Sequence, residues 1–191
     1  MENGEKFEGE KISISDALPK DAAGLRSVEY ETWLDTYADK GTGITREDIQ
    51  WYFNDFKKSF SDRAIVGTAE ELRAMPENEK ALVIKDGDAV VGYAWCVKHS
   101  ESNELGAIYV LPTYQGLGLA RKMWGKISEY FGTGKDIFLT VQAANKKAID
   151  FYKSLGFVEA GSIPSQLTFP SGVKFEEIKM ILPAESGEAG A

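Results

Sequence analysis

The stretch Val110-Leu-Pro-Thr-Tyr-Gln-Gly-Leu-Gly-Leu-Ala120 is the most informative part of this chain. It lies between an apolar, strand-like run (residues 105–110) and a run with helical spacing (residues 121–131). Its two glycines allow a tight turn and leave backbone N–H groups uncovered, and the free amides of the helix's first turn point the same way. Such converging donors bind phosphate or pyrophosphate groups. The pattern therefore predicts an anion-binding loop at residues 115–120, although Gly-x-Gly also occurs in plain turns.

The chain before this stretch reads as a first strand, then helices, then a hairpin. Thr45 and Asp48 form the pattern of a capping box, which predicts a helix start. Asp86-Gly87 supplies the positive φ angles of a tight turn between two strand-like runs. The spacing predicts a strand at 11–15, helices at 21–37, 45–56 and 68–75, and hairpin strands at 81–84 and 89–97.

The chain after this stretch alternates strands and helices. The pattern predicts strands at 104–110, 137–141, 157–163 and 174–182, and helices at 121–131 and 145–155. We therefore expect a flexible leader at 1–11, one domain at 12–183 and a flexible tail at 184–191.

Composition narrows the functional classes. The net charge of −8 argues against a nucleic-acid partner, which usually meets a basic face, and no apolar window approaches the roughly 20 residues that span a bilayer. Cys96 is the only cysteine, so there is no disulfide framework and no cysteine cluster for zinc. We expect a cytoplasmic protein with no membrane partner and no metal.

Two motifs, read together, resemble a known family. The first is Gln115-Gly-Leu-Gly-Leu-Ala120, and the second is Asn145 followed by Ala148-Ile-Asp-Phe-Tyr-Lys-Ser-Leu-Gly-Phe157. They are similar to the Gln/Arg-x-x-Gly-x-Gly/Ala loop and the Asn-x-x-Ala-x-x-Phe-Tyr-x-x-x-Gly-Phe block of the Gcn5-related N-acetyltransferase (GNAT) superfamily. Their order, with a helix and a strand between them, makes the resemblance specific.

The resemblance implies an α/β (α+β) fold. Its central sheet would be mixed and mostly antiparallel, with about six to seven strands, a V-shaped splay between the two central parallel strands, and flanking helices. It also implies acetyl-CoA as cosubstrate, bound by Ile108, Tyr109, Val110, Gln115, Gly116, Leu117, Gly118, Leu119, Ala120, Arg121 and Asn145. Two of these have simpler alternatives, because Arg121 fits a solvated helical turn and Asn145 fits an N-cap.

The implied activity is acetyl transfer from acetyl-CoA to a primary amine by direct attack in a ternary complex. The resemblance assigns Tyr152 as the general acid that protonates the leaving thiolate, with packing beside Phe151 as the alternative. Some relatives carry a glutamate base at the position of Thr140, which leaves Glu104 as the candidate base or as an exposed strand-end charge. His99, the only histidine, reads as a loop residue.

The acceptor is expected to be a small molecule such as a polyamine or amino acid, or a protein amino group. A carboxylate and aromatic rings bind cationic amines, which makes Glu29, Tyr30 and Trp33 candidates for acceptor binding. Trp33 and Tyr37, four residues apart, fit the core equally well. The aromatic segment 51–60 suggests either a pocket wall or a homodimer contact.

Two other classes of function remain open at this point. One is a non-catalytic acyl-CoA-binding sensor on the same fold. The other is a nucleotide-binding protein of the Rossmann or P-loop type. The glycine turn lacks the Gly-Lys-Ser/Thr ending of a P-loop and the third glycine of the dinucleotide motif, which argues against the second class.

Overall fold

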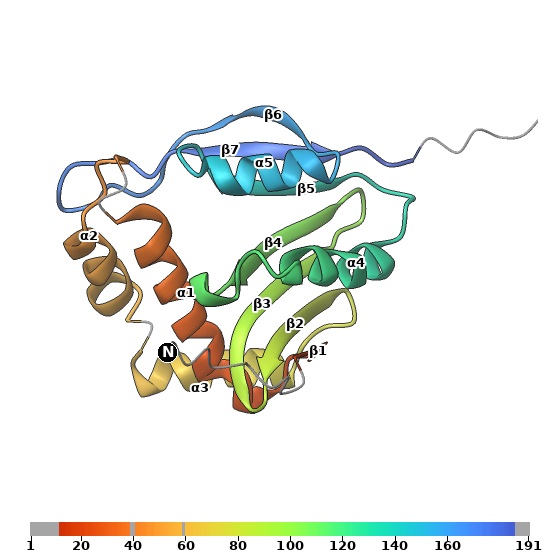
Figure 1. Cartoon of the computed structure of the whole chain (residues 1–191), viewed down its shortest axis with the longest axis horizontal. Coiled ribbons are helices and arrows are strands. Elements are labelled where there is room, and N and C mark those ends of the chain that lie inside the picture. Colours follow the sequence, from red (N-terminus) through yellow and green to blue (C-terminus); the bar gives the residue numbers. More distant parts are fainter. Residues whose placement is uncertain (1–11, 39–40, 59, 186–191) are drawn as a thin grey trace, which may run out of the picture.

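Seven strands form one mixed sheet at the centre of the computed structural model, which describes residues 12–38, 41–58 and 60–185 (Figure 1). The strand order is β1-β2-β3-β4-β5-β7-β6. Only β4 and β5 are parallel, and every other neighbouring pair is antiparallel. This confirms the mixed, mostly antiparallel sheet with a central parallel pair. The strands are β1 (Ser13–Asp16), β2 (Glu79–Asp86), β3 (Ala89–Lys98), β4 (Asn103–Val110), β5 (Ile137–Gln142), β6 (Val158–Ile163) and β7 (Glu177–Leu182).

Helices cover both faces of this sheet. Successive strand residues point to opposite sides, so apolar side chains on both faces are available for packing. On β2, Leu82 and Ile84 join the core that α4 (Leu119–Phe131) and α5 (Lys146–Ser154) cover. Between them, Val83 packs on the other face against α1 (Ala22–Tyr37). The sheet is therefore buried between two layers of helices, with α1 on the face opposite α4 and α5.

Most predicted elements are present, with corrected boundaries. The capping box is confirmed, because Thr45 and Asp48 exchange hydrogen bonds at the start of α2 (Arg46–Trp51). The predicted helix then continues as a π-helical turn, η2 (Tyr52–Phe56). The helix expected at 68–75 instead begins earlier, as α3 (Asp62–Arg73), because Ser61 caps it. Short 3-10 turns occur at η1 (Pro19–Asp21) and η3 (Pro112–Tyr114).

The last strand is shorter than predicted, and parts of both expected ends lie outside the described residues. The last strand begins at Glu177 rather than at residue 174, and Lys174 makes only an isolated bridge to Thr168. The expected leader at 1–11 and residues 186–191 of the expected tail lie outside the described residues. In the described part of that tail, the backbone N–H of Ala184 donates to Asp136 Oδ1 at 2.8 Å.

The aromatic residues near the amino terminus form a cluster inside the chain. The indole of Trp33 stacks between Tyr52 and Phe175, with ring centroids 4.9 Å away on each side. Phe53 is fully buried in the same cluster, whereas Phe56 is 61% exposed. The aromatic excess of segment 51–60 therefore serves mainly to fix α1 and α2 against the loop that precedes β7.

None of the described helices is both long and apolar enough to cross a membrane.

Gly24 permits the close contact between α1 and β3, and its replacement by alanine is expected to destabilise the protein. A Cβ at this position would lie 2.7 Å from Val90 Cβ, which is too short for two carbon atoms. Overpacking of this kind costs about 1–3 kcal/mol. We expect Gly24→Ala to lower the free energy of unfolding by that amount, measured by urea denaturation.

Gly67 of α3 supplies the matched control. A Cβ there would have no atom within 4 Å, so Gly67→Ala is expected to stabilise the helix by about 0.5–1 kcal/mol. Equal stabilisation by both substitutions would contradict the contact with Val90.

Candidate functional site

A cleft opens where the two parallel strands diverge. β4 and β5 pair only at Asn103↔Ile137 and Glu104↔Phe138, and further along they separate toward α1 (Figure 1). The cleft has a volume of about 760 Å³ and is lined by both strands, the glycine-rich loop, α1 and α5. This confirms the V-shaped splay, and it leaves the β4 backbone near Ile108 beside a space wide enough for an extended ligand.

The glycine-rich loop forms one end of the cleft. Gly116 and Gly118 have φ angles of +82° and +73°, in the region that favours glycine, and Gly118 is the N-cap of α4. A Cβ on either glycine would meet no atom within 4 Å, so both border open space. Gly118 has no side chain that could accept a hydrogen bond from the first-turn amides of α4. These N–H groups are therefore not capped by their N-cap residue. The loop thus has the geometry expected of an anion-binding site.

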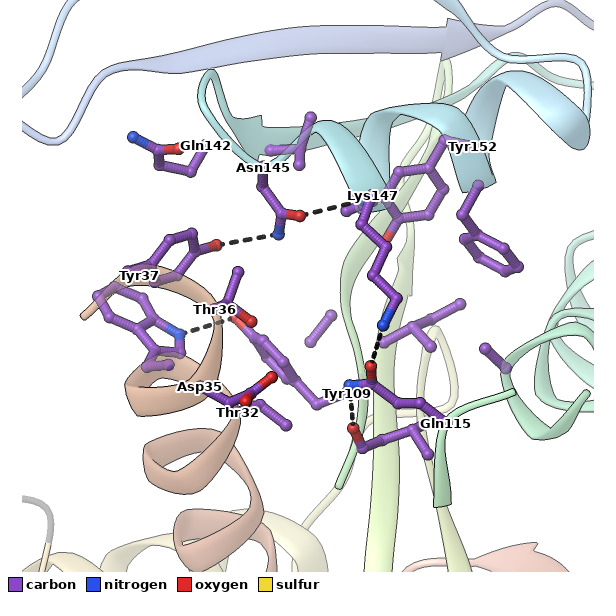
Figure 2. A pocket seen from close by; sticks show the side chains of 18 of the residues that line it. Thr32, Asp35, Thr36, Tyr37, Tyr109, Gln115, Gln142, Asn145, Lys147 and Tyr152 are labelled. Carbon is purple, nitrogen blue, oxygen red and sulfur yellow. Dashed lines mark hydrogen bonds between the residues drawn. The ribbon is translucent and has the colours of Figure 1, made fainter. Parts of the chain in front are cut away.

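Two side-chain contacts join this end of the cleft to α5. The Lys147 ammonium donates to Gln115 Oε1, and Gln115 Nε2 donates to the Val110 carbonyl at 2.9 Å (Figure 2). Arg121 Nη2 donates to Ser154 Oγ at 2.8 Å. Both cations therefore lie beside the glycine-rich loop, where they can neutralise an anionic ligand. Nothing in the sequence distinguishes Lys147 from a solvated first-turn lysine.

Most residues predicted to bind the donor line this cleft. Leu117 of the glycine-rich loop does not line the cleft, and it is 57% exposed. The predicted residues that line the cleft are Ile108, Tyr109, Val110, Gln115, Gly116, Gly118, Leu119, Ala120, Arg121, Asn145, Tyr152 and Trp33.

Tyr152 lies on α5 above the opening between the strands, and Figure 2 shows its hydroxyl directed into the cleft. The residue is 8% exposed, with its ring against Phe151 and Phe157. Burial raises the pKa of Tyr152 above the usual tyrosine value, so the phenol keeps its proton. The ring of Tyr152 therefore packs in the core, while its hydroxyl can still donate a proton.

Asn145 connects α5 with α1. Its Oδ1 accepts from the Ala148 N–H at 3.0 Å, which makes it the N-cap of α5. Its Nδ2 donates to the Tyr37 hydroxyl at 3.4 Å (Figure 2). The N-cap alternative considered for this residue is thus present, and the second bond brings α1 to the cleft.

Trp33 and Tyr37 are both buried, as the core alternative predicted, and both also line the cleft. Trp33 Nε1 donates to the Tyr109 hydroxyl at 3.2 Å, which fixes the α1 side of the cleft against β4. Sequence reasoning missed Asp35 and Thr36, which also line this side. Their spacing of three and four residues from Thr32 was the available signal, because such positions share a helix face.

The structure does not bring three other predicted residues into the cleft. Glu104 lies where β4 and β5 are still paired, and its carboxylate contacts His99 Nε2 at 2.9 Å near the surface. Tyr30 packs edge-on against Phe53. Glu29 lines a second cavity, of about 350 Å³, together with Arg26 and Lys57, and burial raises its pKa.

The fold and the cleft define a class of protein, and a comparison of the whole sequence agrees with it. Residues 42–157, more than half of the chain, match the family model described as the acetyltransferase (GNAT) family. The chain therefore belongs to the GNAT acetyltransferase family, as its two motifs predicted.

Two relatives are similar to this chain over 84 residues each. The chain is 33% identical over 84 residues to an uncharacterized protein of Mycobacterium leprae, covering 42% of this chain and 23% of that protein. It is 37% identical over 84 residues to the mycothiol acetyltransferase of Corynebacterium efficiens, covering 41% and 28%. The chain thus spans about a quarter of the length of these relatives.

Among solved structures, the PaiA N-acetyltransferase of Thermoplasma acidophilum in complex with coenzyme A has a similar fold. The TM-score is 0.69 at 18% identity, over 91% of this chain and 99% of that one. This similarity supports the fold alone.

Proposed function

We propose that this chain transfers an acetyl group from acetyl-CoA to a primary amine by direct attack in a ternary complex. The observation that carries the proposal is the cleft between the diverging strands, with an open glycine-rich loop at one end and the Tyr152 hydroxyl directed into it. The pyrophosphate of acetyl-CoA lies on the amides of Gly116 to Ala120, and the pantetheine arm runs along β4. The thioester then lies below Tyr152.

In this arrangement the backbone N–H groups of β4 near Ile108 and Val110 polarise the thioester carbonyl. Tyr152 donates its proton to the departing thiolate. Lys147 and Arg121 add positive charge beside the loop, and Lys147 exchanges Gln115 for a phosphate oxygen when the donor binds.

The acceptor enters from the α1 side, which carries Thr32, Asp35 and Thr36. It is a primary amine, either a small molecule such as a polyamine or amino acid, or an amino group of a protein. We place the reaction in the cytoplasm, in keeping with Cys96, a buried free thiol whose pKa burial raises to about 12.

A thiol-release assay with acetyl-CoA tests this function. Spermidine, L-lysine and a peptide with a free α-amino group cover the three acceptor classes, and mass spectrometry identifies the acetylated product. Release that depends on one of these amines supports the proposal. Binding of CoA without release for any amine would favour the alternative function, a non-catalytic acyl-CoA sensor.

A further inference from the structure

Tyr152 is the proposed acid for the departing thiolate, but the reaction also requires a base for the acceptor amine. An alkylammonium has a pKa of about 10.4, so only about one molecule in a thousand is neutral near pH 7.4. Something must therefore remove a proton before the amine attacks. Among the described residues that line the cleft, the carboxylates are Asp35 of α1 and Glu177 of β7.

Glu177 is held toward the cleft by a side chain of the neighbouring strand. Thr140 Oγ1 donates to Glu177 Oε1 at 3.2 Å, and both residues line the cleft. On β5, Leu139 and Val141 point into the core beneath α4 and α5. Thr140 therefore points to the opposite face, which is the α1 side. The carboxylate consequently lies on the side from which the acceptor approaches.

Tyr37 of α1 lines the same cleft as this carboxylate. Burial is the largest cause that raises the pKa of Tyr37 to about 12; the hydrogen bond from Asn145 lowers this pKa, and the charge of Glu177 raises it. The Tyr37 hydroxyl accepts the hydrogen bond of Asn145 Nδ2. Glu177 is thus near the α1–α5 contact, on the opposite face of the sheet from Tyr152.

We propose that Glu177, oriented by the Thr140 hydroxyl, is the general base that deprotonates the acceptor amine. This inference rests on the proposed acetyl transfer and deepens it. Asp35 is exposed and has no hydrogen-bond partner for its carboxylate within the described residues, whereas Glu177 is half-buried and held in place. Glu104 is not available, because its carboxylate lies outside the cleft.

The proton steps balance. Glu177 takes one proton from the ammonium and later releases it to solvent. The neutral amine forms a C–N bond with the thioester carbonyl carbon, and the C–S bond breaks. The thiolate receives its proton from Tyr152, and the second proton of the attacking nitrogen returns to the Tyr152 oxygen through water. The products are the acetylamide, CoA thiol and one proton in solution.

Replacing Glu177 by glutamine tests this role through its pH dependence. At pH 7 we expect Glu177→Gln to lower kcat/KM about 100-fold with the most active amine of the panel. The deficit should shrink as pH rises toward the amine's pKa, because solvent then supplies the neutral amine. The other ionisable groups that line the cleft or flank Glu177 are shared by both forms of the enzyme; they are Asp35, Tyr37, Tyr109, Tyr114, Arg121, Lys146, Lys147, Tyr152, Glu176 and Lys179.

Matched variants separate this role from a change in charge or fold. Glu176→Gln makes the same change at the exposed neighbouring residue, which does not line the cleft, and should stay within twofold of the wild type. Thr140→Glu in the Glu177→Gln background places a carboxylate at the adjacent position on the same face and should restore activity at least about tenfold. Thr140→Val alone should give an intermediate loss that also shrinks at high pH. The Kd of acetyl-CoA, measured by calorimetry, should stay within twofold in all of them.

Three results would overturn the assignment. If Glu177→Gln matches the wild type at every pH, the base lies elsewhere while acetyl transfer stands. If its deficit is the same at every pH, Glu177 has only a structural role. If the wild-type protein binds CoA but releases no thiol with spermidine, L-lysine or the peptide, the base and the proposed transfer fall together.

Discussion

Tyr152→Phe is expected to lower kcat for amine acetylation by about 100-fold while the Kd of acetyl-CoA stays within about twofold. General acid catalysis contributes about 10²–10⁴ in rate, and phenylalanine removes only the hydroxyl that points into the cleft. The ring contacts with Phe151 and Phe157 remain, so the fold should not change. Steady-state kinetics at saturating amine gives kcat, and calorimetry gives the affinity.

The pH dependence adds a second readout for the same substitution. Burial raises the pKa of Tyr152, so the phenol is protonated throughout the neutral range and the loss should be similar from pH 6 to pH 9. This contrasts with Glu177→Gln, whose deficit should shrink with rising pH. The two substitutions therefore separate the acid from the base in one set of profiles.

Tyr130 provides the control for Tyr152. It lies on α4 outside the cleft, and its hydroxyl donates to the Glu77 carbonyl at 3.2 Å. Tyr130→Phe should leave kcat within twofold. An unchanged kcat for Tyr152→Phe would mean that this residue only packs α5 against the sheet.

The proposed donor side of the cleft was easier to predict because most of its residues lie in one short stretch of sequence. The loop from Gln115 to Ala120 is proposed to bind through its backbone, and the order of one strand, one turn and one helix determines where those amides point. Tyr152 was expected from its place in the motif that ends at Phe157, and the helix period places it on the same face of α5 as Ile149. Local patterns of this kind need no knowledge of the tertiary register.

The acceptor side was less predictable because it depends on how distant elements meet. Glu104 was expected near the opening, but the strands are still paired there and separate only afterwards. Glu29 lies one helical turn before Trp33, a displacement of about 6 Å along the axis of α1. This displacement places Glu29 in the second cavity instead of the cleft.

Glu177 is a proposed site residue that could not be identified from the sequence, because its position depends on strand pairing. Its contact with Thr140 requires the antiparallel register of β5 and β7, in which Gln142 lies opposite Glu177. The strand was expected to start at residue 174, and a shift of one residue in register would reverse the face of every side chain. Glu177 and Lys179 alternate along β7 with the apolar Ile178 and Met180, but only the strand pairing shows that Glu177 meets Thr140.

Gly118→Val is expected to weaken CoA binding by at least tenfold without unfolding the protein. Gly118 has a φ of +73°, where a side chain costs about 1–2 kcal/mol, so the loop is expected to shift to relieve this strain; a loss of about 1.4 kcal/mol in binding free energy then corresponds to a factor of ten in affinity. A β-branched residue fits this region worst, and its methyl groups would enter the open space above the loop where the pyrophosphate is proposed to lie. Calorimetric titration with CoA measures the loss.

A ligand without phosphate and a second glycine on the same helix make this test specific. Pantetheine lacks the pyrophosphate, so its weak binding should be the same in Gly118→Val and in the wild type. Gly125 also lies on α4, has open space around a Cβ, and has an ordinary helical backbone. Gly125→Ala should therefore raise the unfolding free energy by about 0.5–1 kcal/mol and leave CoA affinity unchanged. If Gly118→Val instead weakens CoA and pantetheine equally, the pyrophosphate does not bind at this loop, and the loss reflects a general distortion of the cleft.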